Sequence, residues 1–415
     1  MSQSWDDLVD HNIPAEQSII LRYHKIFERL RLQLQIGPAE LAACSMGEGV
    51  RLLRLAEHRG VEILVCDESS LMATGTFKDL DACVIAAMAR RAGLERVVLS
   101  SGGNLGYSLS AYGRHSGMHS FFFHPKSTLY KLDAANFTWG GCRLICADLP
   151  ERQVKSLAQR FAEAYGIALV PDIRWRLAAS AARAMFILEA TASESLRVDC
   201  IAQTMCAGYG PAGIYHCFSE LAREGLLRRK EVPRFLGFQQ EANAPMVRAW
   251  RDGEREIRPR HIDPDPDRYL EPGLYNTNPE RNYTRLHDLM SYYGGDLEII
   301  TQADYELYSG PVQELLAGRG IELTRAPGGR EVLEKTALLT GVGILKAIDQ
   351  GRLHREEQVL YMLTGGLRRV ASAAPPTPDL ELDGSRSEDE WLAILGERFG
   401  LRAAPPQRRA DLMVT

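Results

Sequence analysis

The chain has 415 residues, of which 45% are hydrophobic and 25% charged, with a formal net charge of -5 at pH 7. This length predicts two lobes around a cleft, and the composition is that of an ordinary globular protein. The weak negative charge argues against nucleic acid as the main partner, and no apolar run reaches the roughly 18 residues of a membrane span.

The first part of the chain alternates between predicted helices and strands. Residues 1–45 are expected to form an N-terminal helical segment, because 15–35 carry apolar side chains at helical spacing. Short β-rich runs and helices then take turns. The predicted strands are 61–66, 96–100, 119–123 and 143–146, and the predicted helices are 79–92, 104–115 and 150–165. Elements at this spacing indicate parallel sheets with helical crossovers.

A second α/β series begins near residue 184 and includes strand candidates at 199–204 and 235–238. Residues 251–285 break the pattern with prolines, arginines and aspartates, which predicts a long excursion over the surface or the mouth of the cleft. The segment 373–415 opens with a proline-rich linker and contains one helix candidate at 387–399. The residues after this helix are expected to form a mobile C-terminal tail.

Eight cysteines are present, and none forms a Cys-x-x-Cys pair. Cys83, Cys200 and Cys217 lie in apolar surroundings and are interpreted as small core residues. Cys142 and Cys146 are close enough to suggest metal ligands, but no second His or Cys pair accompanies them, so no metal site is predicted. The N-terminus shows no basic leader with an apolar stretch, and a cytoplasmic location is expected.

Lys78 lies in the segment Met72–Asp79, directly after a glycine turn and at the start of a predicted helix. A lysine amine can bond to a carbonyl cofactor and then serve as an acid and base. The N-terminus of the following helix favours nearby anions. Taken alone, Lys78 is better explained as a surface lysine at a helix start, and only its context favours a catalytic role.

Three further segments supply what such a lysine would need. Asn104 lies in a glycine-rich turn between a strand and a helix, where its amide can hydrogen-bond a ring oxygen. The glycine loop 208–213 lies between an apolar run and a helix and can hold a phosphate. Thr364 ends an apolar strand, and its hydroxyl can meet a pyridine nitrogen. Each segment alone also has an ordinary structural explanation.

In this order, the four segments resemble the fold-type II pyridoxal phosphate enzymes, the group of threonine synthase, cysteine synthase and tryptophan synthase β. The resemblance runs from about Gly47 to Arg369 and includes a Gly-Glu-Gly segment at its start. It implies that Lys78 carries pyridoxal 5'-phosphate as an aldimine and that Asn104 contacts the phenolic oxygen. It also implies that Thr364 pairs with the ring nitrogen. The phosphate would be bound by Gly208, Tyr209, Gly210, Pro211, Ala212 and Gly213.

The resemblance further implies a fold of two parallel-sheet α/β lobes with the active site between them. The large cofactor-binding lobe would comprise 46–95 and 185–372, and the small mobile lobe 96–184. A homodimer is expected on the same grounds.

The second half of the chain is most similar to cysteate synthase and the threonine synthases near it. This implies β-replacement on an activated serine-type amino acid, such as O-phosphoserine, through an aminoacrylate and with a small nucleophile. Threonine-synthase-type β,γ-replacement on O-phosphohomoserine and a specialised-pathway enzyme with another nucleophile remain alternatives. A paralogue that only binds cofactor and ligand is the non-enzyme alternative.

Several positions depart from the family pattern. A loop formed by Ser101, Gly102 and Gly103 is expected to bind the substrate carboxylate, but Gly102 stands where the family usually has a hydroxyl. Arg174, Arg176 and Arg183 lie where they could bind a substrate phosphate or carboxylate, although they are equally explained as solvent-facing arginines of a helix. Pro211 also removes one backbone donor from the phosphate loop. These departures leave the substrate open.

Overall fold

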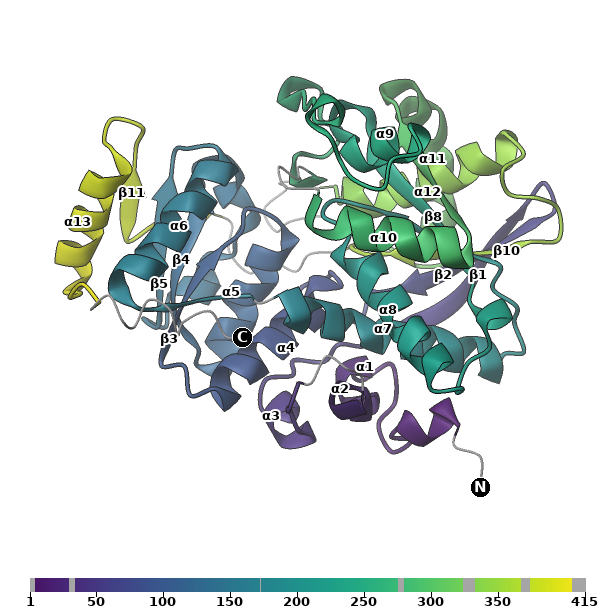
Figure 1. The fold of residues 1–415 in the computed structure, drawn as a ribbon, viewed down its shortest axis with the longest axis horizontal. Coiled ribbons are helices and arrows are strands. Elements are labelled where there is room, and N and C mark those ends of the chain that lie inside the picture. The colour runs from purple at the N-terminus through teal and green to yellow at the C-terminus, as the bar shows by residue number, and fades with distance from the viewer. Residues whose placement is uncertain are drawn as a thin grey trace.

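The computed structural model describes residues 4–29, 34–171, 173–274, 280–323, 333–366 and 374–404. Within these ranges the chain forms two lobes, one on a six-stranded sheet and one on a five-stranded sheet (Figure 1). The strand order is β1-β2-β10-β7-β8-β9 in the larger sheet and β11-β5-β4-β3-β6 in the smaller one. The predicted α/β fold with two largely parallel sheets is therefore confirmed.

The larger sheet begins with an antiparallel hairpin of β1 and β2 and is parallel from β2 onward. Its strands are β1 (Arg51–His58), β2 (Val61–Asp67), β7 (Cys200–Thr204), β8 (Arg234–Gln240), β9 (Gly295–Ile300) and β10 (Gln358–Leu363). Strands such as β2 are apolar on both faces, because helices cover both sides of the sheet. The strands β1 and β9 of this sheet were not predicted.

Two hydrophobic cores lie on the two faces of this sheet. Alternate residues of β2 divide between them, with Leu64 in one core and Ile63 in the other. The first face is covered by α4 (Lys78–Arg91), α7 (Ile173–Ser193), α8 (Tyr209–Arg223), α9 (Pro245–Arg251) and α10 (Glu280–Tyr293). The second is covered by α11 (Gln302–Ala317) and α12 (Lys335–Asp349).

The smaller sheet carries α5 (Asn104–Ser116) on one face and α6 (Glu151–Tyr165) on the other. Its strands are β3 (Arg96–Ser100), β4 (His119–Pro125), β5 (Cys142–Ala147), β6 (Ala168–Leu169) and β11 (Leu380–Leu382). All are parallel. The predicted boundary between the lobes at 184/185 falls inside α7, a continuous helix.

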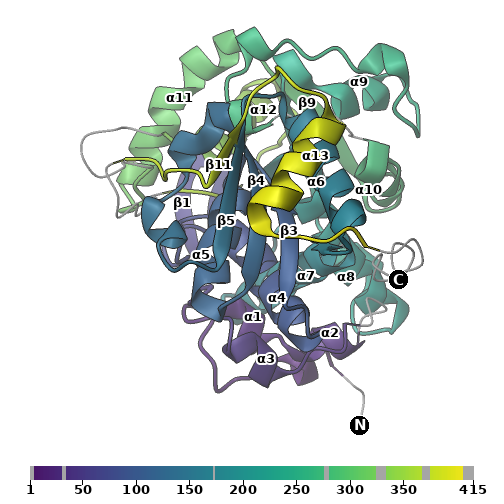
Figure 2. The same cartoon turned by 90° about the vertical axis from the view of Figure 1, so that its left-hand side faces the viewer.

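The C-terminal segment adds more to the smaller lobe than the single helix that was predicted. Strand β11 pairs with β5 at the edge of the sheet, and α13 (Glu388–Phe399) packs beside α6 (Figure 2). Trp391 and Leu395 of α13 are buried against α6 and the sheet. The rest of the expected tail, 405–415, lies outside the described residues.

The N-terminal segment differs from the single predicted helix over 15–35. The structure has two short helices, α1 (Ile19–Arg22) and α2 (Lys25–Arg29), and then α3 (Pro38–Ala42), while 30–33 lie outside the described residues. Ser18 caps α1, and Tyr23 ends it with φ -109° and ψ 24°. The apolar side chains that suggested one helix lie on these two short helices and are buried in the main core.

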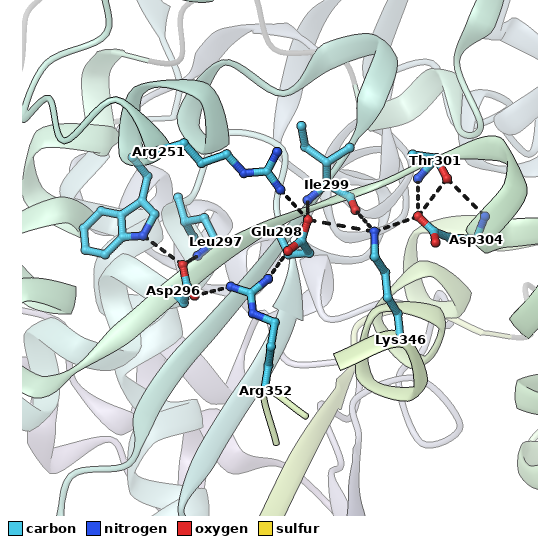
Figure 3. A network of polar contacts seen from close by, with 10 residues as sticks. Arg251, Asp296, Leu297, Glu298, Ile299, Thr301, Asp304, Lys346 and Arg352 are labelled. Atoms are coloured by element: carbon cyan, nitrogen blue, oxygen red, sulfur yellow. Dashed lines mark hydrogen bonds and ion pairs between the residues drawn. The ribbon is translucent and has the colours of Figure 1, made fainter. Parts of the chain in front are cut away.

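The edge strand β9 is held in place by a network of ion pairs (Figure 3). Glu298 accepts a hydrogen bond from Arg251 at 2.5 Å and pairs with Arg352, which also binds Asp296. Lys346 of α12 donates to the Ile299 carbonyl and to Asp304, both at 2.8 Å. The network joins β9 to helices on both faces of the sheet, which fixes the outer edge of the larger lobe.

Candidate active site

A cavity of about 530 Å³ is lined by residues of both lobes. The smaller lobe contributes the loop after β3 and the first turns of α6. The larger lobe contributes Lys78, the start of α8 and the end of β10. Four segments that are far apart in the sequence thus meet in one place, as predicted: Lys78, Asn104, Gly208 to Pro211, and Thr364.

The loop before Lys78 is paired directly with the end of β10. The Phe77 N–H and the Thr76 hydroxyl both donate to the Thr364 carbonyl, at 3.2 and 3.0 Å. On the other side, the Gly366 N–H donates to the Gly75 carbonyl at 2.9 Å. These contacts fix the position of Lys78 relative to Thr364.

Asp79 stabilises the loop before Lys78 through hydrogen bonds from Thr74. Its carboxylate accepts hydrogen bonds from the Thr74 N–H at 2.7 Å and from the Thr74 hydroxyl, which also contacts Ser108 at 2.9 Å. Burial raises the pKa of the Asp79 carboxyl to about 7, against the opposing effect of the Thr74 donors. From the sequence, Asp79 was expected only to start a helix, and this contact was not predicted.

The Lys78 amine lies in a confined and charged environment. It donates to Asp81 at 3.1 Å, and the same carboxylate oxygen accepts from Arg176 at 3.2 Å. Only 15% of the Lys78 side chain is exposed. Burial lowers the pKa of the amine to about 8; Asp81 raises this pKa, whereas Arg176 and Arg183 lower it further. A substantial fraction of the amine is therefore uncharged near neutral pH.

The glycine loop forms the start of α8. Gly208 has φ +73° and caps the helix, so the N–H groups of Tyr209 and Gly210 have no carbonyl partner within the helix. Pro211 has no N–H to offer. These four residues line the cavity, so the positive end of the helix points toward it. Two further residues of the predicted loop do not line the cavity, namely Ala212 and Gly213.

Arg183, predicted to contact substrate, does not line the cavity. Its guanidinium is fully buried and donates to both oxygens of Glu68 at 2.5 and 2.6 Å and to Gln203 at 2.9 Å. A Cβ at position 210 would lie 2.7 Å from its Nη1, so Gly210 lets the loop rest on this arginine. Arg183 points into the protein because it pairs with the buried Glu68 carboxylate. The sequence pattern of the helix did not indicate this partner.

Arg174 does not line the cavity either, whereas Arg176, two residues along the same helix, does. The Arg176 guanidinium lies 3.9 Å from the centre of the Tyr209 ring and also binds Asp81. Arg176 therefore links the glycine loop to the partner of Lys78.

Thr364 and Asn104 face the cavity from opposite lobes. The Thr364 hydroxyl is buried and has no hydrogen-bond partner among the described residues. Asn104 donates from its amide to Glu334 at 3.3 Å. A buried hydroxyl without a partner, at a cavity wall, leaves one hydrogen-bonding position open to a bound group.

The loop predicted to bind substrate is only partly exposed to the cavity. Ser101 and Gly103 line it, and the Ser101 hydroxyl accepts from the Gly106 N–H at 3.2 Å. Gly102 does not line it. Two glutamates that line the cavity, Glu151 and Glu271, were not predicted. Glu271 forms a 3.1 Å ion pair with Lys131 across the two lobes. Glu271 belongs to the excursion predicted over 251–285.

No group of three or more His, Cys, Asp or Glu side chains in the described parts of the chain is arranged to hold a metal ion. The cysteines are free thiols, and all of them except Cys206 are buried. Among the helices that the structure describes, none is long and apolar enough to cross a membrane.

Comparison with known proteins agrees with this geometry. A family model described as pyridoxal-phosphate dependent enzyme matches residues 32–323, which is most of the chain. The chain belongs to this family. It is therefore a pyridoxal-phosphate-dependent enzyme, and the predicted cofactor and family are confirmed.

The chain is similar to characterised relatives of two activities. It is 24% identical to cysteate synthase of Methanosarcina barkeri, over 76% of this chain and 77% of the relative. It is also 24% identical to threonine synthase of Methanosarcina acetivorans, over 86% of this chain and 81% of the relative. Both relatives belong to the group that the sequence motifs suggested.

Solved structures with the same fold include diaminopropionate ammonia lyase from Escherichia coli, with a TM-score of 0.60, 16% identity, and 79% of this chain and 87% of that chain covered. They also include O-ureido-L-serine synthase, with a TM-score of 0.52, 16% identity, and coverage of 79% and 91%. At this identity the likeness concerns the fold.

Proposed function

We propose that this member of the family catalyses β-replacement on an activated serine-type amino acid such as O-phosphoserine. Bound pyridoxal phosphate withdraws electrons from the α-carbon of an amino acid, which weakens the bonds to the α-proton and to a leaving group on the β-carbon. The observation that carries the proposal is the buried Thr364 hydroxyl without a partner, at a strand end paired directly with the Lys78 loop. A neutral hydroxyl at the ring nitrogen favours prompt elimination over a long-lived carbanion.

Residues of the cavity take the following roles in this proposal. Lys78 would hold the cofactor carbonyl and, once released, would remove the α-proton with its amine. Thr364 would pair with the ring nitrogen, and Asn104 with the ring oxygen. The Tyr209 and Gly210 N–H groups and the α8 dipole would bind the phosphate.

The proposed reaction moves one proton to and from Lys78 and exchanges one group on the β-carbon. The α-proton passes to the Lys78 amine, and the leaving group departs from the β-carbon with its bonding electrons. The nucleophile then adds at the β-carbon, and Lys78 returns the proton to the α-carbon. Arg152, Lys155 and Arg176 line the same cavity and would favour an anionic leaving group such as phosphate. The similarity to a cysteate synthase supports this choice, and the similarity to a threonine synthase supports O-phosphohomoserine as the second candidate.

The first experiment follows phosphate release from the purified holoenzyme. With O-phosphoserine, we expect a change in the visible cofactor spectrum and stoichiometric release of phosphate, and sulfite should then give a β-substituted product by mass spectrometry. Release from O-phosphohomoserine alone would favour the threonine-synthase-type reaction. A holoenzyme that releases no leaving group from either substrate, or from other serine esters, would support the paralogue that only binds. Sedimentation of the same preparation tests whether the protein is a homodimer, as expected. The cytoplasmic location is likewise a prediction.

A second prediction concerns the pH dependence of cofactor loading. Only an uncharged amine attacks the cofactor aldehyde, so the loading rate of the apoenzyme should rise with pH and level off above about pH 8, following the lowered pKa of Lys78. At pH 7 about one amine in ten would be uncharged, against about one in three thousand for an ordinary lysine. Rapid mixing with pyridoxal phosphate, followed by absorbance, measures the rate.

Asp81→Asn provides the control for this pH profile. Because the Asp81 carboxylate raises the pKa of Lys78, its removal should shift the midpoint to lower pH. A rate that keeps rising up to about pH 10, the range of an ordinary lysine, would contradict the prediction.

A further inference from the structure

An arginine of the cavity wall, Arg176, lies beside the glycine loop that starts α8. The centre of its guanidinium is 3.9 Å from the centre of the Tyr209 ring, and Tyr209 is the first residue of that helix. Its Nε donates to Asp81 at 3.2 Å, whereas Nη1 and Nη2 make no hydrogen bond within the described part of the chain. Both nitrogens retain exposed surface, the side chain is 15% exposed, and Arg176 lines the cavity. The guanidinium therefore has unused donors at the cavity wall.

The backbone of the glycine loop offers few donors to a phosphate. The Tyr209 and Gly210 N–H groups have no carbonyl partner within the helix. Pro211 has no N–H, and the Ala212 N–H donates to the Gly208 carbonyl at 3.1 Å. A phosphate monoester carries a charge of about -1.5 to -2 at neutral pH and has strong acceptor oxygens. The N–H groups and the helix dipole leave part of this charge unmatched, so a cation is needed at this point.

Arg176 is better placed than Arg183 to supply this cation. The Arg183 guanidinium lies close to Gly210, but it is fully buried, donates to both oxygens of Glu68 and does not line the cavity. The two Nη groups of Arg176, in contrast, are unused at the cavity wall. Such a pair of donors matches two oxygens of one phosphate.

We propose that Arg176 binds the phosphate of pyridoxal phosphate together with the start of α8, and that it compensates for the donor that Pro211 lacks. The proposal rests on the proposed position of the phosphate at this helix and adds a side chain to it. Arg152 and Lys155 of the smaller lobe, which line the same cavity, would still favour an anionic leaving group.

The test compares Arg176→Gln with the wild-type apoenzyme. Its ligands are pyridoxal phosphate and pyridoxal, which differs from it in lacking the phosphate, and both dissociation constants are titrated through the absorbance of the bound aldehyde. Loss of Arg176 also raises the pKa of Lys78, but this affects both aldehydes equally, so the ratio of the two constants reports the phosphate contact. We expect the preference for pyridoxal phosphate over pyridoxal to fall by about tenfold or more.

Two further variants and a matched control sharpen the comparison. Arg176→Lys keeps the charge but not the paired donors, so it should retain more of the preference than Arg176→Gln. Tyr209→Leu keeps the loop N–H groups but removes the ring beside the guanidinium, so the preference should fall by a smaller factor. Arg197→Gln is the control and should leave the preference unchanged. Arg197 also pairs with one aspartate of the larger lobe, but it is 80% exposed and does not line the cavity.

An unchanged preference in Arg176→Gln, in a protein with the wild-type melting temperature, would overturn the proposal. An unchanged preference with weaker binding of O-phosphoserine to the loaded enzyme would overturn it as well, by assigning Arg176 to the substrate. If Arg176→Gln does not fold, an unchanged preference in Tyr209→Leu has the same meaning. A wild-type apoenzyme that does not prefer the phosphorylated aldehyde would instead contradict the proposed phosphate position, so the two failures are distinguishable.

Discussion

Lys78→Ala is expected to abolish the visible band of bound pyridoxal phosphate and to lower the turnover of any substrate by a factor of about 10³ or more. Both the covalent attachment of the cofactor and the group that moves the α-proton are lost. The amine lies at the cavity wall with the Asp81 carboxylate as its partner, and the loop that carries it is hydrogen-bonded to Thr364 through the Phe77 N–H. Absorbance spectra and initial rates measure the two effects.

The fold should survive this substitution. Burial lowers the pKa of the Lys78 amine, so the folded protein does not favour its charged form, and Asp81 keeps Arg176 as a partner. The melting temperature of the apoenzyme is therefore expected to stay close to that of the wild type. Lys126→Ala, which removes an exposed lysine of the smaller lobe paired with Glu381, is the control and should keep full activity. A visible band that persists in Lys78→Ala would refute the assignment.

Arg183→Met should have the largest effect on stability. It leaves the Glu68 carboxylate buried without its counter-charge, which costs about 3–5 kcal/mol of unfolding free energy. It also removes the support under Gly210, so cofactor affinity should fall with stability. Urea unfolding of the apoenzyme and titration with pyridoxal phosphate measure the two losses separately.

The double variant Glu68→Leu with Arg183→Met tests the cause. Removing both charges together should recover much of the lost unfolding free energy, because neither partner is then left buried alone. Cofactor affinity should remain low, since the loop is still unsupported. A single variant that loses less than about 1 kcal/mol would show that water or another group compensates Glu68.

Much of the fold could be predicted from local signals. The helices α4, α5 and α6 and the strands between them follow from apolar periodicity and glycine turns. The strand β11 escaped prediction because its partner β5 comes from a distant part of the chain. The strand β1 pairs with the adjacent strand β2 in a hairpin, and it was missed because Leu55 is its one buried residue, so it has no alternating apolar pattern. The single N-terminal helix was wrong because apolar spacing does not reveal a break between two short helices.

The candidate site divides in the same way. Lys78, Asn104 and Thr364 lie at turns or strand ends, where the backbone pattern itself fixes the position. Long side chains are different, because their direction depends on a partner that only the folded chain provides. Arg183 was therefore misplaced, and Glu151 was not noticed at all. Asp81 could have been found, since it lies three residues after Lys78 on one helix.

The pairing of β11 with β5 has a consequence for synthesis on the ribosome. The other strands of the smaller sheet all lie before residue 170, but its edge strand and outer helix come from 380–399. The nascent smaller lobe must therefore wait, with the edge of β5 uncovered, until more than 200 further residues of the larger lobe have been made. An uncovered strand edge is a site for pairing with other chains. We therefore expect the need for chaperones during translation to depend mainly on the smaller lobe, although most of this lobe is synthesised early.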